Sequence, residues 1–225
     1  MVVSSFAALF LAHVIADYLL QTEWMVANKH RARAIGLHIG AVFLAMPLVT
    51  LTFSPWFVAL AGLHLAIDLT KTHLLRGGLG SYVADQVLHL ASIALVAALA
   101  PGIWEASPLA AIDWVPRFYL ILAMLLFAAR GGQYAVATLF GSDPEADGRG
   151  LRIGWIERAA LSVAVAAGAP WAMLGVLAAK SVHVARALQT RDGSGRARMI
   201  RGSAVSLIWG LACATLLWAV LPTIG

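Results

Sequence analysis

Three histidine–aspartate pairs in the first half of the chain have the residue types and the spacing to form a metal centre. In each pair the two residues are four positions apart, and the flanking sequence is apolar. The pairs are His13/Asp17, His64/Asp68 and Asp85/His89, and His38 stands in a similar apolar stretch. Residues i and i+4 share one face of a helix, so each pair can present an imidazole and a carboxylate to one point. Because burying ionisable groups in apolar surroundings is costly, three such pairs need a shared reason.

These seven side chains, called the donor cluster below, suit a divalent metal ion. Imidazoles and carboxylates bind Zn²⁺, Fe²⁺ or Mn²⁺, and we expect zinc before iron or manganese. The donors suffice for one or two ions, and a two-ion site can activate water as a nucleophile. Cys213 is the only cysteine, which excludes a thiolate cluster and an internal disulfide. The alternative is that each pair is a buried histidine–carboxylate hydrogen bond without a metal.

Within the donor cluster, Asp17, Asp68 and Asp85 are candidates for catalysis as well as for metal ligation. Lys71, three residues after Asp68, is a fourth catalytic candidate, since it can neutralise a carboxylate or a substrate phosphate. The alternative is that Lys71 only extends its ammonium group towards the membrane surface. Further polar residues flank the aspartates and are candidates for orienting them through hydrogen bonds; they are Tyr18, Gln21, Tyr82 and Gln86.

The composition predicts an all-α membrane protein. Of the 225 residues, 61% are hydrophobic and only 12% are charged, whereas a soluble domain has about 25% charged residues. A spanning segment must satisfy its own backbone, and the alternating pattern of a membrane barrel is absent, so the spans are expected to be helices. The net charge of +5 fits basic cytoplasmic loops, and we expect no nucleic-acid partner.

We expect a polytopic transmembrane bundle of about eight helices. The apolar segments cover residues 2–21, 34–53, 56–75, 82–100, 117–139, 155–168, 170–187 and 202–222. Gly168, Ala169 and Pro170 interrupt the stretch 155–187, which is either a hairpin or one kinked span, so seven helices are the alternative. Basic residues gather in alternate loops, and the positive-inside rule places those loops in the cytoplasm and both termini outside. The clearest loop is 142–150.

The rise of a helix places the donor cluster in the cytoplasmic half of the membrane, on four consecutive helices. Helices joined by short loops usually pack as neighbours, so one bundle core can collect all seven groups. We therefore divide the single membrane domain into a four-helix half with the metal site, residues 1–100, and a second half, residues 101–225. In the second half we expect a Glu157–Lys180 ion pair inside the membrane, and Arg158 is expected to reach the headgroups.

The order and spacing of these motifs resemble a bacterial inner-membrane family called domain of unknown function 3307. The matching elements are His13-Asp17-Tyr18-Leu20-Gln21, His64-Asp68-Lys71 and Asp85-Gln86-His89-Leu90. The resemblance implies a multi-pass protein of the bacterial inner membrane, and it implies no activity, because the family has none to transfer. The helix with His64 and Asp68 is also similar, more loosely, to proteins named membrane-bound metal-dependent hydrolases.

We expect a membrane-embedded metal-dependent hydrolase that acts on a lipid or another amphiphilic ester or phosphoester from the inner leaflet. Homo-oligomers are compatible with this expectation. One alternative is a transporter for a divalent metal or protons, since intramembrane histidine and aspartate chains also form ion pathways. The apolar outer halves of the first four segments weigh against it, because a transporter needs a polar exit. The other alternative is a structural or regulatory membrane protein whose metal only stabilises the bundle.

Overall fold

The described part of the chain is almost entirely helical. A computed structural model describes residues 1–141, 148–190 and 193–224, and 87% of it is helix. These ranges contain no strand, so the expected all-α fold is confirmed. Residues 142–147 of the predicted loop 142–150 lie outside the described ranges.

Each of the eight apolar segments coincides with a helix or with a run of consecutive helical turns. In chain order these are α1 with the π-helical turn η1 (Val2–Ile15 and Ala16–Leu20), α3 (Ala32–Thr50), α4 (Trp56–Leu74), α5 (Leu79–Leu99), α7 with the π-helical turn η3 and α8 (Val115–Leu126, Phe127–Gly131 and Gly132–Phe140), α9 (Gly148–Ala166), α10 (Met173–Thr190) and α11 (Gly193–Val220). Shorter elements occupy the connections and the end of the chain, namely α2 (Glu23–Ala27), α6 (Gly102–Glu105), and the 3-10 turns η2 (Pro108–Ala111), η4 (Pro170–Ala172) and η5 (Leu221–Thr223).

Five of these helical runs are long and apolar enough to cross a membrane, within the residues that the structure describes. They are α1 with η1, α3, α5, the run from α7 to α8, and α11 with η5. The helices α4, α9 and α10 are not among the five, because charged and imidazole side chains lower their hydropathy. Examples are Asp68 in α4, Glu157 in α9 and Lys180 in α10.

The stretch 155–187 forms two helices and not one kinked span. α9 ends at Ala166, α10 begins at Met173, and the two helices pack against each other. Gly168 in the turn between them has a φ of +70°, a conformation that glycine adopts at little cost. The turn therefore agrees with the prediction of eight helical segments in preference to seven.

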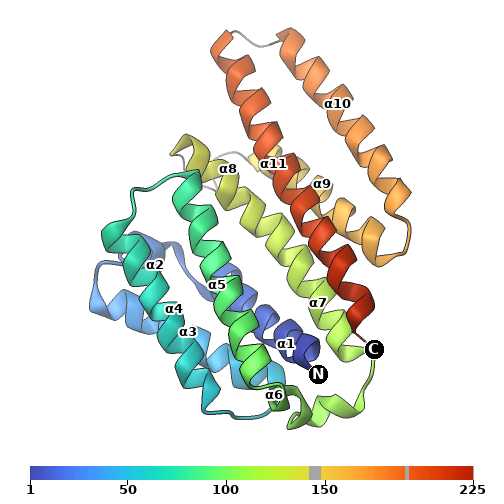
Figure 1. Ribbon diagram of the computed structural model, residues 1–225. Helices are drawn as coiled ribbons and strands as arrows, with labels where there is room; N and C mark the ends of the chain where they lie inside the picture. The colour runs from blue at the N-terminus through green and yellow to red at the C-terminus, as the bar shows by residue number, and fades with distance from the viewer. Residues whose placement is uncertain (142–147, 191–192, 225) are drawn as a thin grey trace. The chain divides into compact units, whose positions relative to one another are not determined.

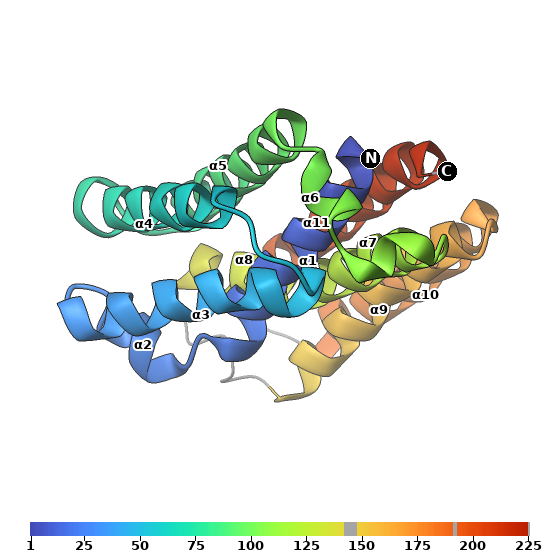
Figure 2. The same ribbon diagram turned by 90° about the horizontal axis from the view of Figure 1, so that it is seen from below.

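The chain divides into two compact units, and the first contains the four helices of the donor cluster. Unit 1 comprises Met1–Ala123 and Pro222–Gly225, and unit 2 comprises Met124–Leu221. In unit 1, α1 packs against α3 and α5, and α4 packs against the same two helices, which closes a ring (Figure 1, Figure 2). α1 is buried along most of its length, in keeping with a helix that is apolar on nearly every side.

Side-chain hydrogen bonds fix the start of α1 and the connection that follows η1. Ser5 Oγ donates to Pro101 O at 2.9 Å and accepts from Trp104 N at 3.1 Å, which joins α1 to α6. At the other end, Thr22 caps α2 by accepting from Met25 N at 3.3 Å, because the first amides of a helix have no partner within it. α2 packs against α3, so the connection between α1 and α3 folds back onto unit 1.

Unit 2 is organised around α11, which packs against α8, α9 and α10. The ion pair expected from the sequence is present, because Lys180 Nζ donates to Glu157 Oε2 at 2.6 Å. The exposed fractions of the two side chains are 12% and 18%. The pair therefore holds α10 against α9 and keeps two largely buried charges together.

The expectation that Arg158 reaches the headgroups is wrong, because its side chain is only 3% exposed. Its guanidinium donates to Ala128 O, Ala129 O and Ser206 Oγ at 2.8, 2.8 and 2.6 Å. The two carbonyls belong to η3, where π-helical winding disturbs the regular hydrogen-bond ladder and leaves acceptors for another donor. A Cβ atom at Gly132 would overlap the Arg158 side chain, so the absence of a side chain there makes room for it.

Candidate metal centre

The donor cluster comes together inside unit 1, with donors from all four helices of the ring. Its members are His13 on α1, Asp17 on η1, His38 on α3, His64 and Asp68 on α4, and Asp85 and His89 on α5. Six of the seven residues are buried, and the Asp17 side chain is 11% exposed. Three groups of three donors, each with atoms within 4.8 Å of one another, share members. The seven residues therefore form one continuous cluster.

None of the three i, i+4 pairs is a self-contained hydrogen bond. The nitrogen–oxygen separations are 3.8 Å in His13/Asp17, 3.8 Å in His64/Asp68 and 3.7 Å in Asp85/His89. These distances exceed the range of a hydrogen bond. Closer contacts come from other helices, as in the 3.1 Å between His38 Nε2 and His64 Nε2. The alternative, in which the histidine and the aspartate of each pair are hydrogen-bonded to each other without a metal, does not fit these distances.

Asp17 lies in the π-helical turn η1, at the point where α1 widens. π-Helical turns are rare and often occur at functional sites. Asp17 Oδ1 is 3.6 Å from His38 Nε2 and 3.5 Å from His64 Nε2. Asp68 Oδ2 faces the same two nitrogens at 3.3 and 3.8 Å. Two imidazoles and two carboxylates therefore converge on one point.

We call these four atoms, Asp17 Oδ1, His38 Nε2, His64 Nε2 and Asp68 Oδ2, the tetrad. A tetrahedral ion with metal–ligand distances of about 2.0–2.2 Å has donor–donor edges of about 3.3–3.6 Å. Five separations within the tetrad lie between 3.1 and 3.8 Å. These five of the six separations, together with the donor types, suit a tetrahedral metal site.

Several donor atoms are buried and have no hydrogen-bond partner among the described residues. They are both ring nitrogens of His13, Asp17 Oδ1, His38 Nδ1, Asp68 Oδ2, Asp85 Oδ1 and His89 Nε2. A buried polar atom left without a partner costs about 1–3 kcal/mol, and most such atoms in proteins are satisfied. A cation inside the cluster would satisfy the carboxylate oxygens and the imidazole lone pairs at once.

Two lysines hold one oxygen each of the aspartates on α4 and α5. Lys29 Nζ donates to Asp68 Oδ1 and Lys71 Nζ donates to Asp85 Oδ2, both at 2.8 Å. The other oxygens, Asp68 Oδ2 and Asp85 Oδ1, are the unpartnered ones. The lysines therefore leave one oxygen of each carboxylate available as a ligand. Lys71 bonds to the carboxylate on the next helix and not to the nearby Asp68.

Lys29 belongs to this site although nothing in its sequence position indicates it. It lies in the connection after α2, 39 residues from Asp68, and its side chain is 17% exposed. Burial by itself lowers the pKa of the ammonium group, but the Asp68 carboxylate, helped by Asp17, raises the pKa above its ordinary value of 10.5. A lysine in a loop predicts only a basic surface, so helical spacing could not have found this contact.

Three of the four polar residues proposed to orient the aspartates form a hydrogen-bonded chain that ends at Asp85. Tyr18 OH donates to Gln86 Oε1 at 2.8 Å and lies 2.7 Å from Tyr82 OH. Gln86 Nε2 donates to Asp85 Oδ2 at 2.9 Å. The fourth residue, Gln21, does not join this chain, and its Nε2 has no partner in the described part of the structure.

The protonation of His89 follows from its backbone contact. Its Nδ1 lies 2.9 Å from the carbonyl oxygen of Asp85. A carbonyl oxygen only accepts, so Nδ1 carries the proton and the lone pair of the neutral ring is on Nε2. Metal-binding histidines commonly show this arrangement, with the second nitrogen bonded to a carbonyl or carboxylate.

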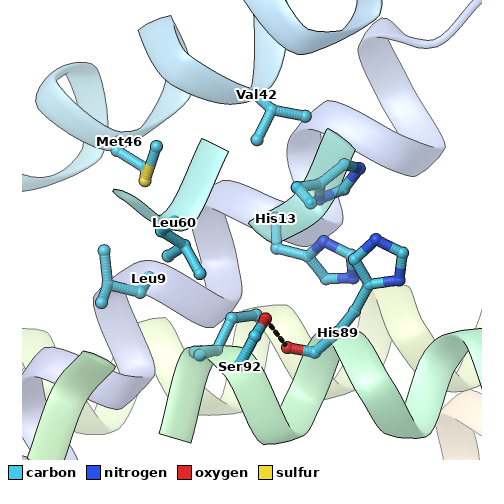
Figure 3. Close-up of a pocket in the computed structure, with 9 residues that line it drawn as sticks. Leu9, His13, Val42, Met46, Leu60, His89 and Ser92 are labelled. Atoms are coloured by element: carbon cyan, nitrogen blue, oxygen red, sulfur yellow. Dashed lines mark hydrogen bonds between the residues drawn. The ribbon is translucent and has the colours of Figure 1, made fainter. Parts of the chain in front are cut away.

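A small cavity of about 10 Å³ adjoins the donor cluster (Figure 3). The imidazoles of His13, His64 and His89 line one side of it. The other walls are mostly apolar and come from Leu9, Val42, Met46, Leu60, Ile93 and Ser92. A cavity of this size holds about one water molecule.

Two further histidines in the first half of the chain lie apart from the cluster. His30 and His73 are exposed and belong to none of the three donor groups. All eight residues predicted for the site are therefore accounted for: the seven donors form one cluster, and Lys71 borders it through Asp85. Their roles in metal binding and catalysis stay predictions.

Residues 5–114 match the family model described as protein of unknown function (DUF3307). The matched range contains the whole donor cluster together with Lys29 and Lys71, and it confirms the resemblance that the motifs indicated. The looser resemblance to membrane-bound metal-dependent hydrolases is not shown by this match. No curated protein and no solved structure matches the chain.

Proposed function

We propose that this protein, whose residues 5–114 match the DUF3307 family model, holds a divalent metal ion in unit 1 and uses it to hydrolyse an ester or phosphoester of a lipid or another amphiphile. The tetrad carries the metal-binding part of the proposal, because its five printed separations of 3.1–3.8 Å suit a tetrahedral ion. Zinc fits two nitrogen and two oxygen donors best, and iron and manganese are the alternatives.

The charges around the cluster favour the binding of a cation, and they favour an anionic ligand once the cation is bound. The three aspartates, taken as ionised, outnumber the two lysines that pair with them. With neutral imidazoles the site carries one net negative charge, and a divalent ion would change this to one net positive charge. Buried uncompensated charge is unfavourable, so a loaded site favours an anionic ligand. A phosphoester meets this requirement better than an uncharged ester.

The chain's own residues would bind the substrate and move protons. A divalent ion supplies polarisation of the ester or phosphoryl oxygen and activation of water. Asp85 is our candidate for a metal ligand or a general base, since its Oδ1 is buried and unpartnered within the described residues. Lys71 is our candidate phosphate contact, because its side chain is 30% exposed while its ammonium group borders the cluster.

We propose the bacterial inner membrane as the location, with both termini outside. Termini on the same side require an even number of crossings. The proposal therefore has all eight helical segments cross, α4, α9 and α10 in addition to the five runs whose length and hydropathy suffice to span a membrane. Basic residues lie in the connections from α1 to α3 and from α4 to α5, among them Lys29, Arg31 and Arg76. The positive-inside rule would turn these connections to the cytoplasm, so an amphiphile would reach the cluster from the inner leaflet.

The test begins with the metal content of protein purified in mild detergent. His64→Ala removes a tetrad donor, and His73→Ala on the same helix removes an exposed histidine as the matched control. We expect elemental mass spectrometry to find metal in the wild type and in His73→Ala, and much less in His64→Ala. Folded wild-type protein without metal, after supply of zinc, iron and manganese, would refute the metal centre.

Hydrolysis is tested on the metal-loaded protein with lipid esters and phosphoesters in mixed micelles. We expect turnover that a chelator abolishes, that His64→Ala lacks and that His73→Ala retains. Loaded protein that hydrolyses neither class refutes the enzymatic part of the proposal. It would favour a structural metal, for which the closed set of four protein donors in the tetrad is the specific argument, since structural zinc sites have no open position.

A further inference from the structure

The geometry points to two different ion sites in the donor cluster: a closed site at the tetrad and an open site at Asp85 and His89 that shares Asp68. This inference rests on the proposed metal centre and gives its two ions different coordination, one closed and one with an exchangeable position. The tetrad offers four protein donors and is complete. The second site offers three, so an ion there keeps one position for an exchangeable ligand, as catalytic zinc sites do.

The donors of the open site lie close together. Asp68, Asp85 and His89 each have a ligand atom within 4.8 Å of the other two. Asp68, Asp85 and His89 are 2%, 3% and 1% exposed. Asp85 Oδ1 and His89 Nε2 have no hydrogen-bond partner in the described ranges. These atoms are not used by the tetrad, so one ion in the tetrad would leave them unsatisfied.

Contacts outside the open site occupy one polar atom of each of its donors and leave the other for a metal. Asp85 Oδ2 accepts from Lys71 Nζ at 2.8 Å and from Gln86 Nε2 at 2.9 Å, which leaves Oδ1 for a ligand. The bond of His89 Nδ1 to Asp85 O leaves Nε2. Lys29 holds Asp68 Oδ1 in the same manner, so Oδ2 is the oxygen left for a metal. Such outer contacts are the usual means of fixing metal ligands.

A cavity borders His89, one of the three donors of the open site. It has a volume of about 10 Å³, so about one water-sized ligand fits. His13 and His89 line its polar side (Figure 3), together with His64. Both nitrogens of His13 lack a partner among the described residues, and its ring stacks on His89 with centroids 5.0 Å apart. His13 is therefore available to hydrogen-bond a ligand in the cavity.

The two sites are distinguished by counting ions in variants of the full-length protein. Metal-free protein in detergent is loaded with Co²⁺ or Zn²⁺, freed of excess metal and measured by elemental mass spectrometry. Wild type and His73→Ala are expected to hold two equivalents. Asp85→Asn and His89→Ala are expected to hold one, while the tetrad keeps its ion. Circular dichroism shows that each variant is folded, and Asp85→Asn preserves side-chain shape where His89→Ala does not.

The order in which a chelator removes the two ions provides a second test. We expect a chelator to remove one equivalent from the wild type quickly and the other slowly, and to remove only the slow one from Asp85→Asn. A wild type with a single equivalent that survives in Asp85→Asn would overturn the two-site inference and leave the metal centre intact. Two equivalents retained in folded Asp85→Asn and His89→Ala would also overturn it. A wild type without metal would refute both proposals.

Discussion

Replacing Lys29 by methionine removes the partner of a buried carboxylate, and we expect a large loss of stability in the metal-free protein. Lys29 Nζ lies 2.8 Å from Asp68 Oδ1, and the two side chains are 17% and 2% exposed. With an effective dielectric constant of about 20, the Coulomb attraction at this distance is about 6 kcal/mol. Desolvation of the two charges offsets part of it. Breaking a buried pair from one side costs about 3–5 kcal/mol, which is the loss we expect.

A double-mutant cycle separates this pair from general damage to the fold. Lys29→Met, Asp68→Asn and the double variant are unfolded in mixed micelles with a chelator present, because a bound cation would also compensate Asp68. Each single variant is expected to lose about 3–5 kcal/mol of unfolding free energy. The double variant is expected to lose no more than either single variant, since no buried charge is left alone. Arg33→Met, at an exposed basic position, is the control and should change stability by less than about 0.5 kcal/mol.

Additive losses would refute this reasoning. If the double variant lost the sum of the two single losses, Lys29 and Asp68 would not be coupled. The argument that Lys29 leaves only Asp68 Oδ2 for a metal would then fail with it. A loss below about 1 kcal/mol in Lys29→Met would show that the pair is solvated and worth no more than a surface ion pair.

Two further predictions concern pH and packing. The folded-state pKa of Lys29 is raised above 10.5, so the folded state holds this proton more tightly than the unfolded state. The stabilisation of the fold by the charged Lys29 is therefore complete below about pH 10.5. It is lost as the pH rises through the folded-state pKa. Thermal unfolding above this pH should show a steeper loss for wild type than for Lys29→Met, and equal slopes would contradict the assignment. In unit 2, Gly132→Ala forces a Cβ atom into Arg158 and should cost about 1–3 kcal/mol, whereas Gly175→Ala has open space and should be neutral or slightly stabilising. The same melting temperature for both glycine variants would contradict the packing argument.

Local periodicity was enough to find the donors and their helices. Helical segments lie at all eight predicted positions. Apolar length accounts for the five that can span a membrane, because a chain segment in an apolar environment must satisfy its own backbone. The i, i+4 spacing of His13 and Asp17, and of His64 and Asp68, placed each pair on one helix face. Their convergence was also predictable in outline, since consecutive helices with short connections pack as neighbours.

The sequence by itself therefore determined an all-α chain with four donor-bearing helices, and only the tertiary structure decided which atoms meet. It pairs Lys71 with Asp85 across helices, brings Lys29 to Asp68 from a connection 39 residues away, and turns Arg158 into the interior of unit 2. Helical spacing constrains residues within one helix. It says nothing about rotation and depth between helices, which packing sets, and the ångström distances of the tetrad depend on both.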